Sequence, residues 1–179
     1  MTASGWLRLV AVVVVGLVFQ VAVLDDITVF GAHPDVMILI AACAGMAAGS
    51  QRGAIAGFLA GLAADLVVNL PYGLSSLTFV LVGFGTGLLQ ANIAARDVES
   101  TQAAVCVAAS AAGTLLYALL GALTGRSGLL GLGTVYAVVV VTLGAIVLSW
   151  PALRCLRWVF AGSRARLGLV VPRGGSAVR

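Results

Sequence analysis

The stretch GMAAGSQRGAIAGFLAGLAADLVVN, residues 45–69, has a glycine at every fourth position and an aspartate at the next step. The series is Gly45, Gly49, Gly53, Gly57, Gly61 and then Asp65. Four helical residues turn ~400°, so each step moves only ~40° around a helix, and the residues from Gly53 to Asp65 share one broad stripe. In lipid, such small residues let helix backbones approach closely. The stripe therefore predicts a packing face.

The composition is that of an integral membrane protein. Of the 179 residues, 61% are hydrophobic and 9% are charged, and the mean hydropathy is +1.15. A soluble domain of this composition would have too few polar residues to cover its surface. The first apolar segment, residues 9–24, lacks a small-x-small cleavage site at its end, which favours a retained helix over a signal peptide.

The uncharged runs divide into six expected helices, near residues 6–24, 35–50, 53–69, 73–95, 101–124 and 131–153. Breaks are expected at Gln51, Arg52 and Gly53, and again in the Pro-containing and Gly-containing segment 69–73. If Asp65 were a loop residue, segment 53–64 would cover only ~18 Å of the ~30 Å bilayer core. Asp65 therefore lies within a span. The sequence predicts an all-α, polytopic fold with residues 1–153 as one six-helix transmembrane domain.

The arginines predict the orientation. With six spans, nine of them share one side and Arg126 lies opposite; the nine are Arg8, Arg52, Arg96, Arg154, Arg157, Arg164, Arg166, Arg173 and Arg179. Cytoplasmic loops carry the excess of basic residues, and the three tryptophans fall at the same ends. We expect a cytoplasmic-membrane protein with both termini in the cytoplasm. Residues 154–179 form an Arg-rich, partly disordered tail, which either lies along the anionic membrane lipids or serves only as a topology signal.

Asp65 is the one charge expected at membrane depth. A carboxylate there costs at least ~2.5–3.5 kcal/mol, so it should face protein or a wet cavity. Three roles follow in decreasing order: a hydrogen bond between helices of this chain, a contact to a partner's transmembrane helix, and a proton or ion relay. A relay usually needs several such groups. Asp35, after Pro34, is interpreted as a helix start signal.

Enzymatic chemistry is not indicated. The sequence holds no Ser-His-Asp set, paired carboxylates, phosphate-binding loop or metal-ligand cluster, and nothing typical of nucleic-acid binding. Cys43, Cys106 and Cys155 form no CxxC motif and are interpreted as small packing residues. We expect no enzyme activity, no metal and no cofactor.

An ordered set of residues carries a family resemblance. Gln20 lies late in the first helix, Pro34 and Asp35 open the second, the pattern GFxxGLxxD covers residues 57–65, and Gly73 follows the next turn. Across residues 9–153 the chain resembles the rod shape-determining protein MreD family. The resemblance implies a non-enzymatic scaffold of the bacterial cell-elongation complex, which synthesises peptidoglycan and sets cell shape. The motif positions, partner-binding or structural, are Pro34, Asp35, Gly57, Phe58, Gly61, Asp65 and Gly73.

The implied partners are an MreC-like bitopic protein and, more widely, the MreB filament, a RodA-type glycosyltransferase and its transpeptidase partner. On this hypothesis a partner's transmembrane helix packs along the stripe of Gly57, Gly61 and Asp65. A different hypothesis, that the protein is a proton-coupled channel or antiporter, would require Asp65 to change its protonation during transport.

The same family is similar to the membrane subunits of energy-coupling-factor transporters, which implies a related six-helix arrangement. The alternative function is therefore the substrate-binding subunit of a vitamin transporter. Its pocket would need polar and aromatic groups that converge near the outer face. Only Asp65, Asn69, Tyr72, Tyr136 and the acidic first loop qualify.

Overall fold

The computed structural model describes residues 3–24, 35–67, 73–93, 99–123 and 132–167. All elements in these ranges are helical and none is a strand, which confirms the all-α expectation. They are α1 (Ala3–Phe19), which a π-helical turn η1 (Gln20–Leu24) extends, α2 (Val36–Ala48), α3 (Ser50–Val67), α4 (Leu74–Ile93), α5 (Glu99–Leu123) and α6 (Leu132–Leu167).

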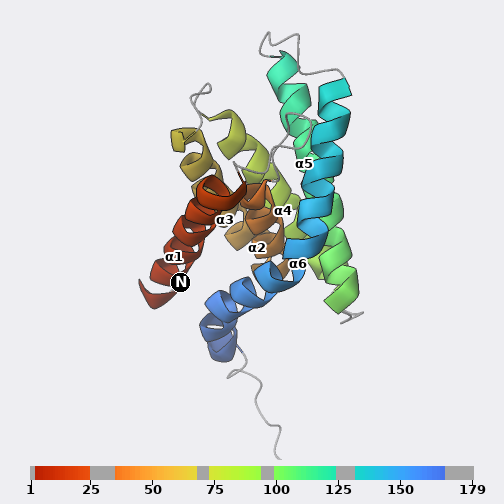
Figure 1. Ribbon diagram of the computed structural model, residues 1–179. Helices are drawn as coiled ribbons and strands as arrows, with labels where there is room; N and C mark the ends of the chain where they lie inside the picture. Colours follow the sequence, from red (N-terminus) through yellow and green to blue (C-terminus); the bar gives the residue numbers. More distant parts are fainter. Residues whose placement is uncertain (1–2, 25–34, 68–72, 94–98, 124–131, 168–179) are drawn as a thin grey trace, which may run out of the picture.

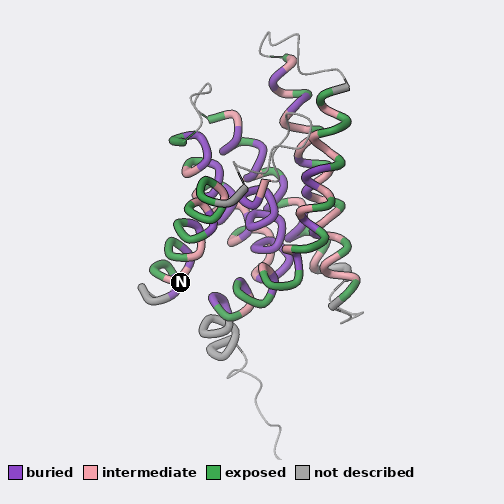
Figure 2. The backbone as a smooth tube through the Cα atoms, viewed as in Figure 1, coloured by how far each residue is buried: buried purple, intermediate pink, exposed green. Residues whose placement is uncertain are grey.

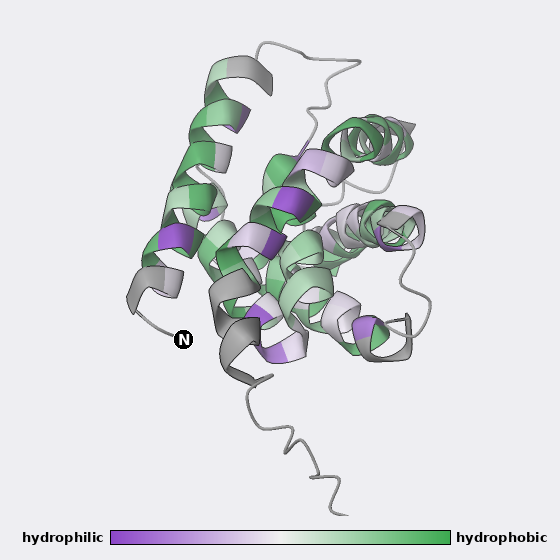
Figure 3. Cartoon of the chain, turned by 90° about the horizontal axis from the view of Figure 1, so that it is seen from below, coloured by the Kyte–Doolittle hydropathy of each residue, from purple (hydrophilic) through white to green (hydrophobic). Residues whose placement is uncertain are grey.

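The helices differ in their capacity to cross a membrane. Among the described residues, Gly5–Ala22, Ser100–Leu123 and Gly133–Phe160 are long and apolar enough to do so, while Val36–Ala48 and Leu74–Gln90 are apolar but shorter. With 13 residues, α2 rises only ~20 Å. Seen from the end where α1 starts, most of the helical surface is hydrophobic (Figure 3). The long helices are therefore compatible with membrane insertion.

The helices alternate in direction, so that α1 begins and α6 ends at the same end of the bundle (Figure 1). The centre of the bundle is α2, whose residues 36–47 are all buried (Figure 2). It contacts each of the other α-helices. A helix that is apolar and buried on every side needs no amphipathic pattern. The core of the molecule is therefore built around a short helix.

The break between the second and third helices lies at Gly49, and not at residues 51–53 as expected. Gly49 has φ = 88°, a conformation that favours glycine, and its N–H donates to the Gly45 carbonyl at 2.9 Å. Because Gly49 ends α2, α3 begins at Ser50. Gln51 and Arg52 therefore lie in the first turn of α3.

The last helix runs to Leu167 and not to residue 153, and Pro151 lies inside it. Four apolar side chains beyond the proline are buried: Leu153, Leu156, Val159 and Phe160. Their spacing of three or four residues gives this segment one apolar face, and burial of that face offsets the hydrogen bond that proline cannot donate. The expected boundary between a transmembrane domain and a tail thus falls within α6. Residues 168–179 lie outside the described part of the chain.

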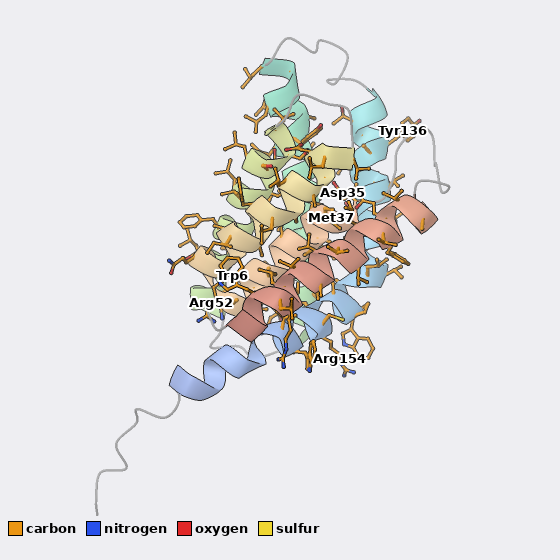
Figure 4. All side chains as sticks on the ribbon, turned by 90° about the vertical axis from the view of Figure 1, so that its left-hand side faces the viewer. Trp6, Asp35, Met37, Arg52, Tyr136 and Arg154 are labelled. Carbon is orange, nitrogen blue, oxygen red and sulfur yellow. The ribbon has the colours of Figure 1, made fainter. Side chains whose placement is uncertain are left out.

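One end of the bundle carries the described basic side chains; we call it the Arg end. Trp6, Arg52 and Arg154 lie toward it, and Tyr136 lies toward the opposite end (Figure 4). Two interactions join helices there. The Arg8 guanidinium stacks on the Trp158 ring at 4.6 Å, and Arg157 donates to Gln102 Oε1 at 2.7 Å. Arg96, Arg126, Arg173 and Arg179 lie outside the described residues.

Candidate functional site

The glycine stripe of α3 packs directly against the backbone of α4. A Cβ added to Gly57 would overlap the Phe79 carbonyl, and a Cβ added to Gly61 would overlap the backbone of Ser76. Six residues from three helices share this kind of contact, and we call them the glycine contact: Gly45, Gly53, Gly57, Gly61, Gly83 and Gly87. Each has backbone of another helix, or of the turn before it, where a side chain would be. The predicted packing face is confirmed.

Asp65 ends the stripe at the first turn of α4. Its side chain is only 2% exposed and accepts four hydrogen bonds. Oδ2 accepts from Gly73 N at 2.9 Å, from Ser76 N at 3.2 Å and from Ser76 Oγ at 2.9 Å, and Oδ1 accepts from Ser75 N at 3.3 Å. The first N–H groups of a helix lack intrahelical partners, and a carboxylate near them also interacts favourably with the helix dipole. Asp65 therefore caps α4 from a neighbouring helix.

This geometry decides between the roles expected for Asp65. The first role, a hydrogen bond between helices of this chain, is confirmed. The expectation that a partner's helix packs along Gly57, Gly61 and Asp65 is wrong, because α4 fills that stripe. The four hydrogen bonds that the carboxylate accepts all come from residues 73–76.

A second cap lies at the start of α2. Asp35 Oδ1 accepts from Met37 N at 2.9 Å and from Ile38 N at 3.3 Å, which confirms Asp35 as a helix start signal. Gln20 adds a second acceptor from η1: its Oε1 accepts from Val36 N at 3.0 Å and from Met37 N at 3.3 Å. The start of α2 is thus tied both to its own capping residue and to the end of the first helix.

The other residues of the family-like pattern lie in different places. Gly73 belongs to the Asp65 cap, and its φ of 104° explains the preference for glycine there. Phe58 is 49% exposed and lies beside the glycine stripe, on an outer stripe with the exposed Leu62 and Leu66. Pro34, Asn69 and Tyr72 lie outside the described residues.

Two residues that bind the Asp65 carboxylate were not predicted from the sequence. Ser75 and Ser76 are both buried and supply three of the four donors to Asp65. Serine is common at helix starts, so Ser75 and Ser76 could have indicated that a helix begins shortly after Gly73. What the sequence did not reveal is that their partner is on the preceding helix.

Two of the three cysteines are buried, as expected for small packing residues. Cys43 on α2 and Cys106 on α5 are free and buried in the core, whereas Cys155 on α6 is free and exposed. Within the part of the chain that the structure describes, no three metal-ligating side chains gather.

No family model matches the chain, and neither a curated protein nor a solved structure does. Three features of this structure bear on function: the glycine contact, the caps at the starts of α2 and α4, and the outer stripe of α3. Each of them joins helices or presents an apolar surface.

Proposed function

We propose that the protein is a six-span scaffold of the cytoplasmic membrane, of the MreD type, that supports the cell-elongation complex and with it peptidoglycan synthesis and cell shape. One observation carries the proposal. The residues of the MreD-like pattern pair in space, Gln20 with the start of α2 and Asp65 with the start of α4. The proposed fold is related to the membrane subunits of energy-coupling-factor transporters.

The caps support membrane insertion of the short helices. Backbone groups in the bilayer core must find partners within the protein, because no water is available there. Asp65 and Gln20 supply partners to helix starts that would otherwise require water. Short helices such as α2 then lie in the bilayer without reaching both surfaces. The gathering of Arg52 and Arg154 at one end supports a cytoplasmic placement of that end (Figure 4).

The partner surface that we propose is the outer stripe of α3, since α4 occupies the glycine stripe. Phe58, Leu62 and Leu66 are exposed at intervals of four residues along one face. A transmembrane helix of an MreC-like bitopic protein packs there, with Phe58 as the aromatic anchor. The MreB filament and the RodA-type enzyme pair are reached through that partner.

A pull-down tests the proposal. The tagged protein is extracted in mild detergent from its own cells, and the co-purifying proteins are identified by mass spectrometry. Wild type should recover MreC-like and wall-synthesis proteins, and Phe58→Ala should reduce the recovery about tenfold, as expected for a buried aromatic anchor.

The matched control is Phe84→Ala, since Phe84 is an exposed phenylalanine on the outer face of α4. It should leave recovery unchanged. An equal loss with both variants would contradict the proposed surface. Recovery of ATP-binding-cassette subunits in place of wall-synthesis proteins would contradict the scaffold and favour the vitamin transporter.

A further inference from the structure

An apolar groove lies between α1 and α6 and ends at a cation. Its volume is about 640 Å³, and α2 forms its floor with Val36 and Ile40. The small residues Ala11 and Ala152 leave it hollow. Among the described residues that line it, Arg8 carries the one charged side chain. The groove is therefore apolar along its length and basic at one end.

Aromatic rings and guanidinium groups alternate along α6 at this end. Trp150, Arg154 and Trp158 follow one another at intervals of four residues, so they share one helix face. Arg154 stacks on Trp150 at 4.1 Å, and Arg8 reaches across from α1 to stack on Trp158 at 4.6 Å. Stacking uses the face of the guanidinium plane, whereas its N–H donors lie in that plane and point outward. A guanidinium that stacks on a ring in this way keeps N–H donors available to an anion.

The length of the groove matches one half of a bilayer. Along α1 it extends from Leu7 to Phe19, which at ~1.5 Å per residue is ~18 Å. Half of the ~30 Å hydrocarbon core is ~15 Å. Tryptophan rings favour the headgroup level, and Trp158, which lines the groove and lies beside Arg8, marks that level. An acyl chain in the groove would place its headgroup beside Arg8.

We propose that this groove binds an anionic phospholipid, with one acyl chain between α1 and α6 and the phosphate at Arg8 and Arg154. Charge complementarity selects this occupant. An apolar partner helix would fill the groove and leave the Arg8 guanidinium without an anion, whereas a phosphate there accepts hydrogen bonds from Arg8. Arg154, on the same face of α6 but outside the groove lining, is the second cation for that phosphate. The inference needs only that the chain lies in a bilayer, and it does not depend on the scaffold role.

Native mass spectrometry of the purified full chain in detergent tests the proposal. The chain is titrated with phosphatidylglycerol and, separately, with phosphatidylethanolamine of the same acyl composition. Phosphatidylglycerol should bind at least about fivefold more tightly, the factor expected for one basic residue near an anionic lipid. Arg8→Gln and Arg154→Gln should each reduce that preference, and Ala11→Leu should weaken the binding of both lipids because it fills the groove.

Each variant has a matched control. Arg52→Gln removes a charge at the same end but outside the groove, and Ala108→Leu enlarges an exposed alanine of α5. Both should bind phosphatidylglycerol as wild type does. Equal binding of the two lipids by wild type would overturn the proposal, as would an effect of Arg52→Gln as large as that of Arg8→Gln. A co-purified polypeptide that Ala11→Leu displaces, with lipid binding unchanged, would overturn it as well.

Discussion

Helices meet in two ways in this molecule, and Gly57 and Gly16 illustrate the difference. At Gly57 a Cβ would overlap the backbone of α4. At Gly16, on α1, a Cβ would meet the ends of the Ile40 and Met37 side chains. Backbone cannot move aside, whereas a side chain can change its rotamer. The inner helices α2, α3 and α4 are therefore fixed in position, while α1 packs adaptably and leaves a groove beside it.

The polar groups follow the same division. Among the inner helices, the starts of α2 and α4 donate hydrogen bonds to side chains of the preceding helical segments. At the Arg end, Arg8 and Arg154 stack on tryptophans near the surface. A polar group deep in the bundle specifies how helices meet, because leaving it unpaired is costly there.

The largest effect is expected when a side chain is added at the inner contact. Gly57→Leu or Gly61→Leu should prevent accumulation of the folded protein, because the cost exceeds the ~1–3 kcal/mol of ordinary overpacking. Membrane levels and detergent-extracted monodisperse protein give the readout. Gly85→Leu is the control, since nothing lies within 4 Å of its Cβ position. Equal tolerance at Gly57 and Gly85 would contradict the glycine contact.

Substitution of Asp65 should rank second, with a graded result. Asp65→Leu leaves four donors without an acceptor, at ~1–3 kcal/mol for each buried group. Asp65→Asn keeps an oxygen at the position of Oδ2 and loses only the bond from Ser75 N, so we expect a loss of ~1–3 kcal/mol. Thermal unfolding of the purified variants compares them. Equal losses would show that the negative charge at the start of α4, rather than the number of hydrogen bonds, carries the stabilisation.

The sequence predicted the fold class and the inner contact, because both depend on local patterns. The four-residue spacing placed Gly57, Gly61 and Asp65 on one stripe. The free-energy cost of a carboxylate at membrane depth predicted a buried partner for Asp65. The sequence could not identify that partner, because tertiary structure determines which helix packs against the stripe. Leu156 and Phe160 extend α6 past Pro151 for the same reason: their burial depends on neighbours that are distant in the sequence.

A smaller effect is expected at the start of α2. The Met37 N–H is shared between Asp35 Oδ1 and Gln20 Oε1. Asp35→Ala should cost ~1 kcal/mol, as for other N-caps, and Gln20→Leu a similar amount. The double variant should lose more than the sum of the two, because only then does Met37 N lose both acceptors. Thermal unfolding of the four proteins measures the coupling, and additive losses would show that the acceptors act independently.

The smallest effect is expected at the outer contact. Gly16→Ala requires only that the ends of Ile40 and Met37 shift, and alanine favours the helix by ~1 kcal/mol over glycine. The unfolding temperature should therefore change little, whereas Gly57→Ala should lower it strongly. If both alanines destabilise equally, the distinction between inner and outer contacts does not hold.

The central claim is that Asp65 on α3 holds the first turn of α4 within one chain. Hydrogen exchange of the purified protein, without partners, tests it most directly by comparing wild type with Asp65→Leu, which removes the acceptor of all four hydrogen bonds. We predict faster exchange at the amides of residues 73–76, eight or more positions away in the sequence, and unchanged exchange along α3. Unchanged exchange at residues 73–76 would contradict the cap and return Asp65 to a contact with another protein.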